Sequence, residues 1–312
     1  MPPPKIIPAI SRAANIPFYV IGHGHIGRRH AQLIAAHAGA DLTAICDPLP
    51  REALDLDAAT PHFTDFAELL TKGPGARVAC ICTPNGLHAS QAIACLEAGL
   101  HVVVEKPLAL TVAEAEAIIS AARKAARHVF GVMQNRYSPA SAWLKEQIER
   151  WTLGEILQVH LDCFWNRDHR YYTIPTEETD QSKKRAKRAE NSGSPSSIVN
   201  RQSSIVNRPP HPWHGHPTLD GGVLFTQFAH FIDLLCWCFG EVTVHAARFA
   251  NQNHEDLHVF ADTGTVHFSL GKGTLGSLNF STAIWDRNFE STLTVIGAKG
   301  TIKLGGQYMN EL

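Results

Sequence analysis

The stretch FYVIGHGHIGRRHAQLIAA, residues 18–36, decides the fold of the chain. Its apolar start predicts a buried strand over Phe18–Ile21, and the residues that follow have the period of a helix, predicted over Ile26–His37. The turn between these two elements has the spacing G-x-G-x-x-G. In a strand–turn–helix context this spacing predicts a dinucleotide-binding site rather than a simple change of chain direction.

Each glycine of the motif has a physical role in such a site. Gly22 allows a tight turn, Gly24 lets a pyrophosphate approach the backbone, and Gly27 lets the helix pack closely on the strand. The helix N-terminus, where His25 and Ile26 lie, presents free N–H groups and the positive end of the helix dipole to the phosphates. All five residues are predicted cofactor contacts.

A carboxylate follows the second predicted strand, Leu42–Cys46. Asp47 stands 20 residues beyond Gly27, at the spacing where an acidic side chain accepts the ribose hydroxyls of a dinucleotide. Because this carboxylate repels a 2′-phosphate, the sequence predicts NAD in preference to NADP. Arg51 lies close enough in the sequence to keep NADP open as the alternative.

The first half of the chain continues to alternate short apolar strands with helices as far as Met133. Continuous apolar strands separated by helices predict a doubly wound α/β domain with a parallel sheet. The remaining predicted strands are Val78–Cys82, Val102–Val104 and Val129–Met133, and the remaining predicted helices are Phe66–Leu70, Leu87–Ala98 and Val112–Ala126.

The second half has a different pattern, and the boundary is predicted between residues 137 and 138. Segments of alternating apolar and polar residues follow one another between Gly, Asp and Asn turns, which predicts an α+β domain with one large open antiparallel sheet. The predicted helices are Ala140–Arg150 and Val223–Phe239, and the predicted strands are Glu155–Phe164, Val242–Phe249, Leu257–Leu270, Thr274–Ile284, Ser291–Val295 and Gly300–Leu304.

Residues 175–212 fit neither pattern. They contain a basic cluster at 183–188 and a tandem heptapeptide, in which residues 196–201 recur as 203–208. This segment is predicted to be a disordered insertion. No aromatic residues are interleaved with the basic cluster, which favours a solvated loop over a nucleic-acid patch.

The composition sets the class of protein. With 312 residues, 44% hydrophobic residues and a formal net charge of -1, the chain has the length of two domains and the composition of a soluble globular protein. It lacks the net positive charge that is typical of nucleic-acid-binding domains. It also lacks the long apolar run that is typical of a membrane span. Without a secretory pattern, a cytoplasmic location is predicted, and the seven cysteines are predicted to be reduced core thiols.

Polar residues follow the third and fourth predicted strands. In an open α/β sheet the carboxyl ends of the strands face the ligand, so these residues are predicted cofactor contacts. Lys106 is the ionisable group placed where nicotinamide and substrate meet, unless it is a surface ammonium paired with Glu105. The strand-end residues are Thr83, Pro84, Asn85, His88, Glu105 and Lys106.

The predicted helix Val223–Phe239 carries a polar stripe. Thr226, His230 and Asp233 stand at i, i+4 and i+7 and therefore share a face, with Gln227 at its edge. A histidine on an apolar helix is often a core residue, and the polar neighbours here favour a site.

These motifs resemble, in order and spacing, those of the Gfo/Idh/MocA oxidoreductases. The similarity runs from Phe18 to Asn310 except for the insertion, and it includes Glu105-Lys106-Pro107 and Gly221-Gly222 followed by His230-x-x-Asp233. It implies a Rossmann domain followed by an α/β domain with an open sheet, and hydride transfer between NAD(P) and a secondary hydroxyl of a sugar or cyclitol. Residues 132–137 and 219–227 look most like members that act on the C3 hydroxyl of UDP-N-acetylglucosaminuronate.

The resemblance also implies roles for individual residues. Lys106 would hydrogen-bond the reacting hydroxyl and hold the nicotinamide, and His230 would take the hydroxyl proton. An imidazole titrates near neutral pH, and an ammonium stabilises a developing alkoxide. Many members carry Asp where this chain has Thr226, so Thr226 and Gln227 are expected only to position substrate.

Further residues are candidate contacts for sugar and acidic groups, because Arg and Tyr suit carboxylates and sugar rings. The alternative for each is a packed surface residue. A metal at His211, His214 and His216 is not predicted, because no partner carboxylate or Cys is visible. A homo-oligomer through the open sheet is expected. The candidate contacts are Asn135, Arg136, Tyr137, Trp165, Asn166, Arg167 and Tyr172.

Two features favour other functions. Thr226 stands where many members have Asp, and this favours a nicotinamide-binding regulator without turnover. The chain also ends earlier than its relatives, which is expected to remove a closing strand and favours the same alternative. A lyase or glycosidase that uses NAD for a transient oxidation is the third hypothesis. The presence of both Lys106 and His230 favours the dehydrogenase.

Overall fold

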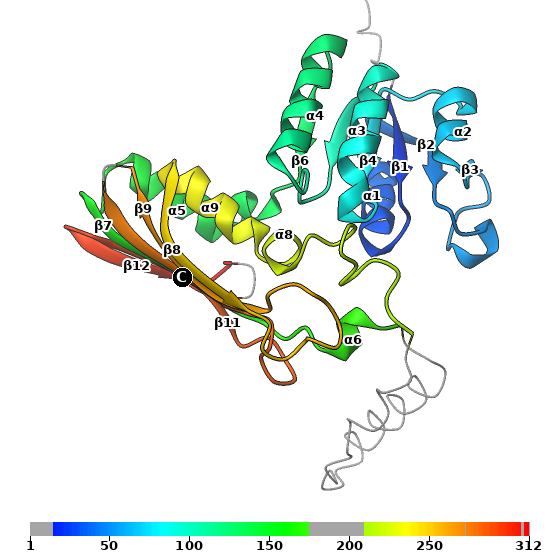
Figure 1. Ribbon diagram of the computed structural model, residues 1–312. Helices are drawn as coiled ribbons and strands as arrows, with labels where there is room; N and C mark the ends of the chain where they lie inside the picture. The colour runs from blue at the N-terminus through cyan, green and yellow to red at the C-terminus, as the bar shows by residue number, and fades with distance from the viewer. Residues whose placement is uncertain (1–14, 175–208, 272, 307–308, 312) are drawn as a thin grey trace, which may run out of the picture. The chain divides into compact units, whose positions relative to one another are not determined.

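The computed structural model describes residues 15–174, 209–271, 273–306 and 309–311. The chain forms two compact units (Figure 1). Unit 1 contains the described residues up to Thr83 together with Leu87–Val132, and unit 2 contains Pro84–Gly86 and the described residues from Met133 onward. The change between the units at 132/133 lies five residues before the boundary expected from the sequence, at 137/138.

Unit 1 is built on a six-stranded parallel sheet with the order β3-β2-β1-β4-β5-β6 (Figure 1). The order reverses between β1 and β4, which is the point where doubly wound sheets bind their ligands. The strands are β1 (Ile16–Ile21), β2 (Ala40–Cys46), β3 (His62–Phe63), β4 (Val78–Ile81), β5 (His101–Val104) and β6 (Val129–Gly131). The predicted doubly wound sheet is therefore confirmed, with one short edge strand, β3, that the sequence did not indicate.

Helices cover both faces of this sheet. On one face Val20 and Ile45 pack against Ala31 and Ile34 of α1, and on the other the strands pack against α3 and α4. This burial explains the continuous apolar runs of the strands. The helices are α1 (His25–Ala36), α2 (Phe66–Lys72), α3 (His88–Glu97) and α4 (Val112–Ala125), with a short 3₁₀ turn η1 (Arg51–Ala53). A second short turn, η2 (Asn85–Leu87), begins in the Pro84–Gly86 segment of unit 2.

Unit 2 contains a second six-stranded sheet with the order β12-β11-β7-β10-β9-β8. Its strands are β7 (Ile156–Phe164), β8 (Val242–Ala250), β9 (Thr263–Leu270), β10 (Thr274–Ser281), β11 (Glu290–Gly297) and β12 (Gly300–Leu304). Its helices are η3 (Gln134–Tyr137), α5 (Pro139–Glu149), α6 (His169–Tyr172), α8 (Val223–Thr226) and α9 (Ala229–Phe239).

The second sheet is mixed, which corrects the purely antiparallel sheet expected from the sequence. β7 lies between β11 and β10 and runs parallel to β10, whereas the other neighbouring pairs are antiparallel. The alternating pattern reports which face of a strand is buried but carries no information about which strand lies beside it. The first strand of the unit, β7, therefore lies between two strands that were expected to be neighbours, β10 and β11.

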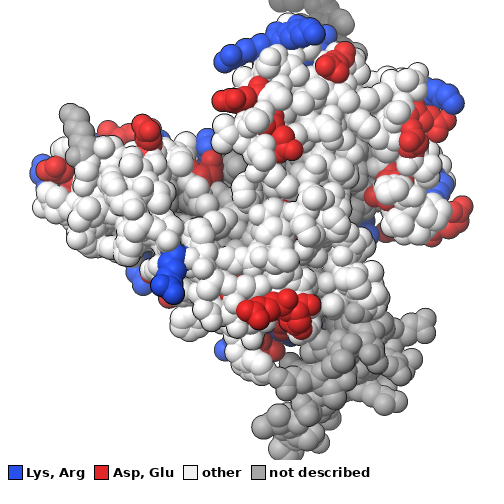
Figure 2. Space-filling model, in the orientation of Figure 1, with Lys and Arg blue, Asp and Glu red and all other residues white. Residues whose placement is uncertain are grey.

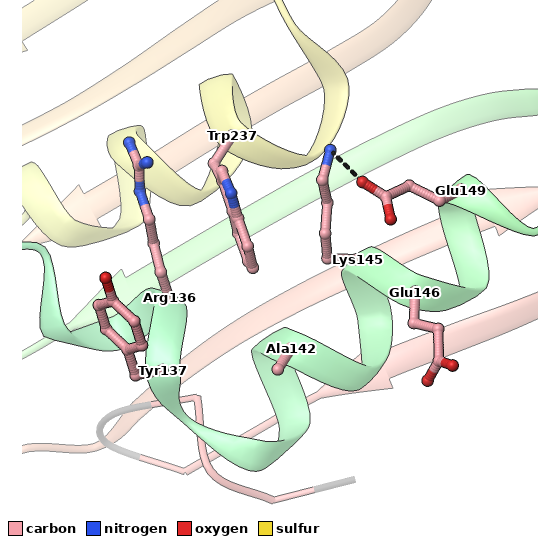
Figure 3. A pocket seen from close by; sticks show the side chains of 7 residues that line it. All are labelled: Arg136, Tyr137, Ala142, Lys145, Glu146, Glu149 and Trp237. Carbon is pink, nitrogen blue, oxygen red and sulfur yellow. Dashed lines mark ion pairs between the residues drawn. The ribbon is translucent and has the colours of Figure 1, made fainter.

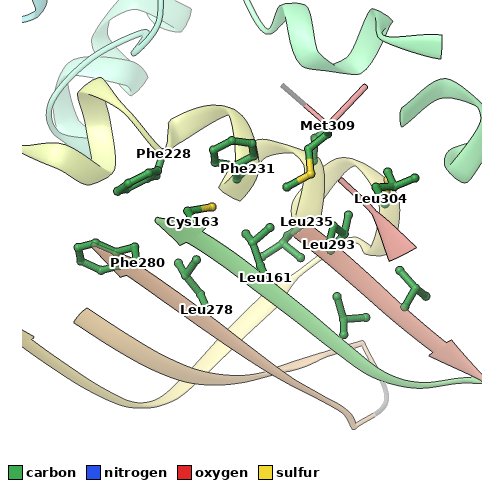
Figure 4. Packing of buried hydrophobic residues seen from close by; sticks show 14 of the residues in the cluster. Leu161, Cys163, Phe228, Phe231, Leu235, Leu278, Phe280, Leu293, Leu304 and Met309 are labelled. Carbon is green, nitrogen blue, oxygen red and sulfur yellow. The ribbon is translucent and has the colours of Figure 1, made fainter. Parts of the chain in front are cut away.

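One face of this sheet is covered by α5 and α9 and holds the core of unit 2 (Figure 4). Leu161 and Cys163 of β7 point to this face and meet Phe228 and Phe231 from the helical side. Along β7 and β9 buried residues alternate with exposed or half-buried ones. The other face of the sheet is therefore the more exposed one.

Two predicted elements differ from the structure because tertiary contacts interrupt them. The helix expected over Val223–Phe239 is divided into α8 and α9 at Gln227 and Phe228. The strand expected over Leu257–Leu270 begins only at Thr263, because Asp262 accepts hydrogen bonds from the backbone N–H groups of Gln252 and Asn253 and closes a loop.

Most of the predicted insertion, residues 175–208, lies outside the described residues. Its last four residues, 209–212, are described and are attached to unit 2. Thr173 forms an antiparallel bridge with Pro210, and the N–H of His211 donates to the carbonyl of Tyr172 at 2.8 Å. These four residues therefore belong to unit 2 rather than to the insertion.

Charges of both signs are dispersed in small groups over the described part of the face in Figure 2. None of the described helices is long and apolar enough to cross a membrane.

All seven cysteines lie in described ranges as free thiols. Five of them are buried, whereas Cys236 of α9 is exposed, contrary to its predicted place in the core.

Candidate functional site

The glycine loop of unit 1 has the tight packing that its sequence requires. Gly22 has φ +86°, and a Cβ there would lie 2.7 Å from the carbonyl oxygen of Cys82. A Cβ at Gly27 would lie only 1.8 Å from the carbonyl oxygen of Gly22. At Gly24, by contrast, a Cβ would meet no heavy atom within 4 Å. Two of the glycines therefore serve the fold, and the third faces open space.

The open position lies at the N-terminus of α1. Gly24 is the N-cap residue, and no side chain caps the helix there. His25 is exposed and Ile26 is half-buried in the first turn. An uncapped helix start beside a glycine that leaves space is suited to a phosphate group. These residues therefore fit a dinucleotide pyrophosphate.

The carboxylate of Asp47 is held by the backbone. Its Oδ2 accepts from the N–H of His23 at 2.7 Å, and its Oδ1 accepts from the N–H of Leu49 at 3.0 Å. Each carboxylate oxygen has a second lone pair, so both can still accept a hydroxyl. Asp47 is only 8% exposed, so its position is fixed before any ligand arrives.

Arg51, which kept NADP open as the alternative, is engaged in its own loop. Its guanidinium donates to the carbonyl of Thr60 at 2.8 Å and to the carbonyl of Asp57. A guanidinium with these two backbone acceptors would have to give them up to bind a 2′-phosphate. The loop geometry therefore adds to the preference for NAD.

The loop contains one buried side chain that the sequence did not single out. His23 stands between the first two glycines and is 4% exposed, with no hydrogen-bond partner for either ring nitrogen among the described residues. Burial lowers the pKa of His23, against the opposing influence of Asp55 and Asp47. A neutral imidazole therefore lies beside the Asp47 carboxylate at neutral pH.

The residues after β4 separate into two groups. Asn85 is buried, and its amide donates to the carbonyl of Asp220 at 2.7 Å within unit 2, to which Pro84–Gly86 belong. Thr83 remains in unit 1, where its hydroxyl donates to Gln91 at 2.6 Å. His88 is 1% exposed and contacts two backbone carbonyls with its two ring nitrogens. His88 is therefore an internal brace, and its contact with the cofactor stays a prediction.

Glu105 and Lys106 follow β5. Glu105 is buried, and its carboxylate is paired with His30 of α1 at 2.9 Å. Burial alone would raise the pKa of Glu105, but His30 and Lys106 together hold it below its usual value. Lys106 is half-buried directly after this carboxylate. The sequence did not indicate His30, because its partner lies 75 residues away.

In unit 2 the buried side chain of Asp220 organises the turns that precede α8. This side chain is 2% exposed, and its two oxygens accept from the N–H groups of Gly215 at 2.7 Å and Gly222 at 2.9 Å. Thr226 donates its hydroxyl to the carbonyl of Gly222 at 2.8 Å. His230, at the start of α9, is 7% exposed. Thr226 and His230 therefore lie on different helices, and not on the one continuous face expected from the sequence.

Gln227 stands at the break between α8 and α9. Its Oε1 accepts from Nε of Arg167 at 2.8 Å, and its Nε2 donates to the hydroxyl of Tyr171 at 2.7 Å. The guanidinium of Arg167 lies over the rings of Trp165 and Tyr171. These contacts accompany the helix break and form a polar cluster, in which Nη1 of Arg167 also donates to the carbonyl of Asn166 at 2.6 Å. Tyr171 was not indicated by the sequence.

Trp165 is part of the core. It is 5% exposed, its indole N–H donates to Ser291 at 2.7 Å, and its ring packs edge-on against Phe228 and Phe231. Tyr172, 4% exposed, is likewise buried. Both side chains therefore have packing roles, and the sugar contacts predicted for them stay predictions.

The three candidate side chains of η3 have different surroundings. Arg136 forms a bidentate ion pair with Asp233 of α9, whereas Asn135 is buried and Tyr137 is 86% exposed. Figure 3 shows Arg136 beside Trp237 in a surface pocket between α5 and α9. Asp233 and Arg136, both considered for the site, therefore neutralise one another on the helical side of unit 2.

The histidines after the insertion stack on one another instead of converging. His211 and His214 have ring centroids 3.9 Å apart, and His214 stacks on Tyr171 at 4.1 Å, while His216 is exposed. Within the described ranges, no group of three or more His, Cys, Asp or Glu side chains is placed to hold a metal ion.

Asp220 offers a test of the organisation of unit 2. Asp220→Ala leaves the buried N–H groups of Gly215 and Gly222 without acceptors, so we expect the free energy of unfolding to fall by about 2 to 4 kcal/mol. Urea unfolding of both proteins measures the difference. The exposed Asp256 provides the matched control, because Asp256→Ala should change stability by less than about 0.5 kcal/mol. Equal effects in the two variants would contradict the role given to Asp220.

Two family models match the chain. The model described as an oxidoreductase family with an NAD-binding Rossmann fold matches residues 16–132, and the model of the GFO/IDH/MocA C-terminal domain matches residues 196–303. The first match covers the described part of unit 1 almost completely, the second covers the later part of unit 2, and residues 133–195 are matched by neither model. Unit 1 is therefore an NAD-binding Rossmann domain.

Curated relatives match about half of the chain or less. Inositol 2-dehydrogenase of Salmonella typhimurium is 30% identical over 169 residues, which cover 52% of this chain and 48% of the relative. D-glucoside 3-dehydrogenase of Escherichia coli is 30% identical over 142 residues, or 44% of this chain and 40% of the relative. The chain thus spans about half the length of the curated relatives it matches, or less.

Solved structures match over nearly the whole chain. The WlbA dehydrogenase of Bordetella pertussis, crystallised with NADH and UDP-GlcNAcA, has a TM-score of 0.79 and 29% sequence identity. The alignment covers 95% of this chain and 81% of that one. Levoglucosan dehydrogenase in complex with NADH has a TM-score of 0.71 at 23% identity, which shows the common fold.

Proposed function

The chain belongs to the Gfo/Idh/MocA family of oxidoreductases, and on that premise we propose that it transfers hydride between a secondary hydroxyl of a sugar or nucleotide sugar and NAD. The observation that carries this proposal is the glycine loop, where Gly24 leaves the start of α1 open beside the fixed carboxylate of Asp47. NAD, when bound there, supplies the hydride acceptor.

The side chains have separate tasks in the proposed reaction. The ammonium of Lys106 hydrogen-bonds the reacting hydroxyl and stabilises the negative charge that develops on its oxygen. His230 takes the hydroxyl proton as a general base. Thr226 has its hydroxyl bonded to the carbonyl of Gly222, and a hydroxyl is no base at neutral pH, so Thr226 positions the Gly221–Gly222 turn or the substrate.

A UDP-linked uronic acid sugar is the substrate we propose within this class. The support is the likeness to the Bordetella enzyme that was crystallised with UDP-GlcNAcA, together with the cluster of Arg167, Tyr171 and Gln227, which suits an acidic sugar. We further propose that the open sheet of unit 2 mediates self-association.

The test is a screen for NADH formation. Purified protein with NAD is offered UDP-GlcNAcA, myo-inositol and simple glucosides, and the absorbance of NADH is followed. Net NADH with UDP-GlcNAcA supports the proposed substrate, and net NADH with another sugar supports the class only. Binding of NAD by calorimetry without turnover on any of them would instead favour a nicotinamide-binding regulator.

Cofactor preference gives a second measurement. Asp47→Ser should weaken NAD binding by about 1 to 3 kcal/mol, because a charge-assisted hydrogen bond to the ribose is lost. Calorimetry with NAD and NADP measures both affinities in the wild-type protein and the variant. Tighter binding of NADP than of NAD by the wild-type protein would show that the role given to Asp47 is wrong.

A further inference from the structure

Lys106 is held from one side by a pair of buried side chains. Glu105, the residue before it, is 8% exposed, and its Oε1 lies 2.9 Å from Nε2 of His30 on α1. The other oxygen, Oε2, accepts the backbone N–H of Lys106 at 3.2 Å. The Glu105 carboxylate therefore joins the helix that begins at the glycine loop to the backbone of the lysine.

The residue after Lys106 is held by a second histidine. His88 of α3 is 1% exposed, and its Nδ1 lies 2.7 Å from the carbonyl oxygen of Pro107. Its Nε2 lies 2.9 Å from the carbonyl oxygen of Thr83, at the end of β4. The ring thus spans the segments that follow β4 and β5, which flank one another in the sheet.

The chemistry of His88 makes this brace sensitive to substitution. Both acceptors are carbonyl oxygens, so both contacts are hydrogen bonds only when both ring nitrogens carry a proton. Burial lowers the pKa of His88, while the two carbonyls and the Glu105 carboxylate oppose this and Lys106 adds to it, so the neutral ring donates to one of the two carbonyls and only packs against the other. A leucine at this position removes both contacts, whereas an asparagine keeps one N–H donor.

We propose that His30 and His88 are positioning residues for Lys106, which fix the Glu105–Pro107 segment from both sides and so set the placement and reactivity of its ammonium. This inference rests on the proposed function, in which Lys106 acts on the reacting hydroxyl. Neither histidine touches the substrate in this scheme. Preorganisation of this kind matters because a shift of about 1 Å in a reacting group can cost roughly a hundredfold in rate.

The experiment reads the lysine amine directly. Wild type, His30→Leu and His88→Leu are treated with acetic anhydride over a range of pH, and acetylation of Lys106 is quantified by peptide mass spectrometry. We expect both variants to shift the midpoint of the Lys106 profile by about half a pH unit or more, because the neighbouring carboxylate and backbone are released. The conservative variants His30→Gln and His88→Asn, each with an N–H donor, should lie closer to wild type.

The control is His128→Gln. His128 stacks on His101 at the amino ends of β5 and β6, at the opposite end of these strands from Lys106, so its variant should give the wild-type profile. Circular dichroism verifies folding, and the conservative variants keep the test usable if a leucine variant does not fold. Lys106 profiles that superimpose on wild type in all folded His30 and His88 variants would overturn the proposal.

A kinetic readout separates this proposal from the proposed function. With a sugar that is turned over, the leucine variants should lose roughly tenfold to a hundredfold in kcat, with a smaller change in KM. If no sugar is oxidised by the wild-type protein, the proposed function fails, while the acetylation profiles still decide whether the two histidines set Lys106.

Discussion

Lys106→Ala is expected to lower kcat for sugar oxidation by roughly a hundredfold or more while NAD binding stays nearly intact. The ammonium is the only cation proposed to act on the reacting hydroxyl, and loss of an oxyanion-stabilising group costs on the order of 10²–10³ in rate. NAD binding depends mainly on the glycine loop and Asp47, which the substitution does not touch. Single-turnover hydride transfer and calorimetry with NAD measure the two effects separately.

His230→Ala and Thr226→Val complete this comparison. His230→Ala should also lose roughly a hundredfold or more, as is usual when a general base is removed. Thr226→Val should lose less, because its hydroxyl is already donated to the carbonyl of Gly222. Wild-type hydride transfer in the His230 variant would remove this residue from the mechanism and favour a binding protein over an enzyme.

Much of the fold could be predicted because burial leaves a local pattern in the sequence. Strands such as Val20–Ile21 and Ala79–Ile81 are buried on both faces of the first sheet, so they read as continuous apolar runs. The two-residue strand β3 has no such run and could not be found. The place of β7 between β10 and β11 also has no local sign, because strand order depends on contacts between distant segments.

The candidate site likewise contains features with a local sequence pattern and features that depend on contacts between distant segments. The glycine motif and Asp47 have fixed spacings in one strand–helix–strand unit, and the structure has these elements as β1, α1 and β2. The pairing of His30 with Glu105 and the bonds of Asp220 to Gly215 and Gly222 depend on how the loops fold. His88 and Trp165, the predicted contacts of cofactor and sugar, are both buried, and a residue pattern does not indicate the packing that surrounds a side chain.

The helix break at Gln227 shows why a periodic pattern can mislead near a site. Residues 223–239 are apolar enough for one helix, and the pattern gives no reason to stop. The side chain of Gln227 nevertheless accepts from Arg167 and donates to Tyr171. Two polar contacts to another segment of unit 2 thus accompany the interruption, and such a local exception to a sequence pattern is typical of a functional region.

The glycine loop offers the sharpest test of fold against binding, because two of its glycines differ in what surrounds them. Gly27→Ala places a Cβ 1.8 Å from the carbonyl oxygen of Gly22, so α1 must move away from the end of β1. We expect a loss of about 3 kcal/mol or more in the free energy of unfolding, as for severe overpacking, and with it the loss of measurable NAD binding. Urea unfolding and calorimetry with NAD report the two losses.

Gly24→Ala is the matched comparison on the same loop. Its φ of −65° suits alanine, and the new Cβ meets no heavy atom within 4 Å, so stability should change by less than about 1 kcal/mol. If a pyrophosphate lies against Gly24, the added methyl group occupies the space that the phosphate needs, and NAD affinity should fall roughly tenfold or more. Wild-type NAD affinity in this folded variant would show that the phosphates do not lie against Gly24. Reduced NAD affinity at unchanged stability would separate the binding role of Gly24 from the packing role of Gly27.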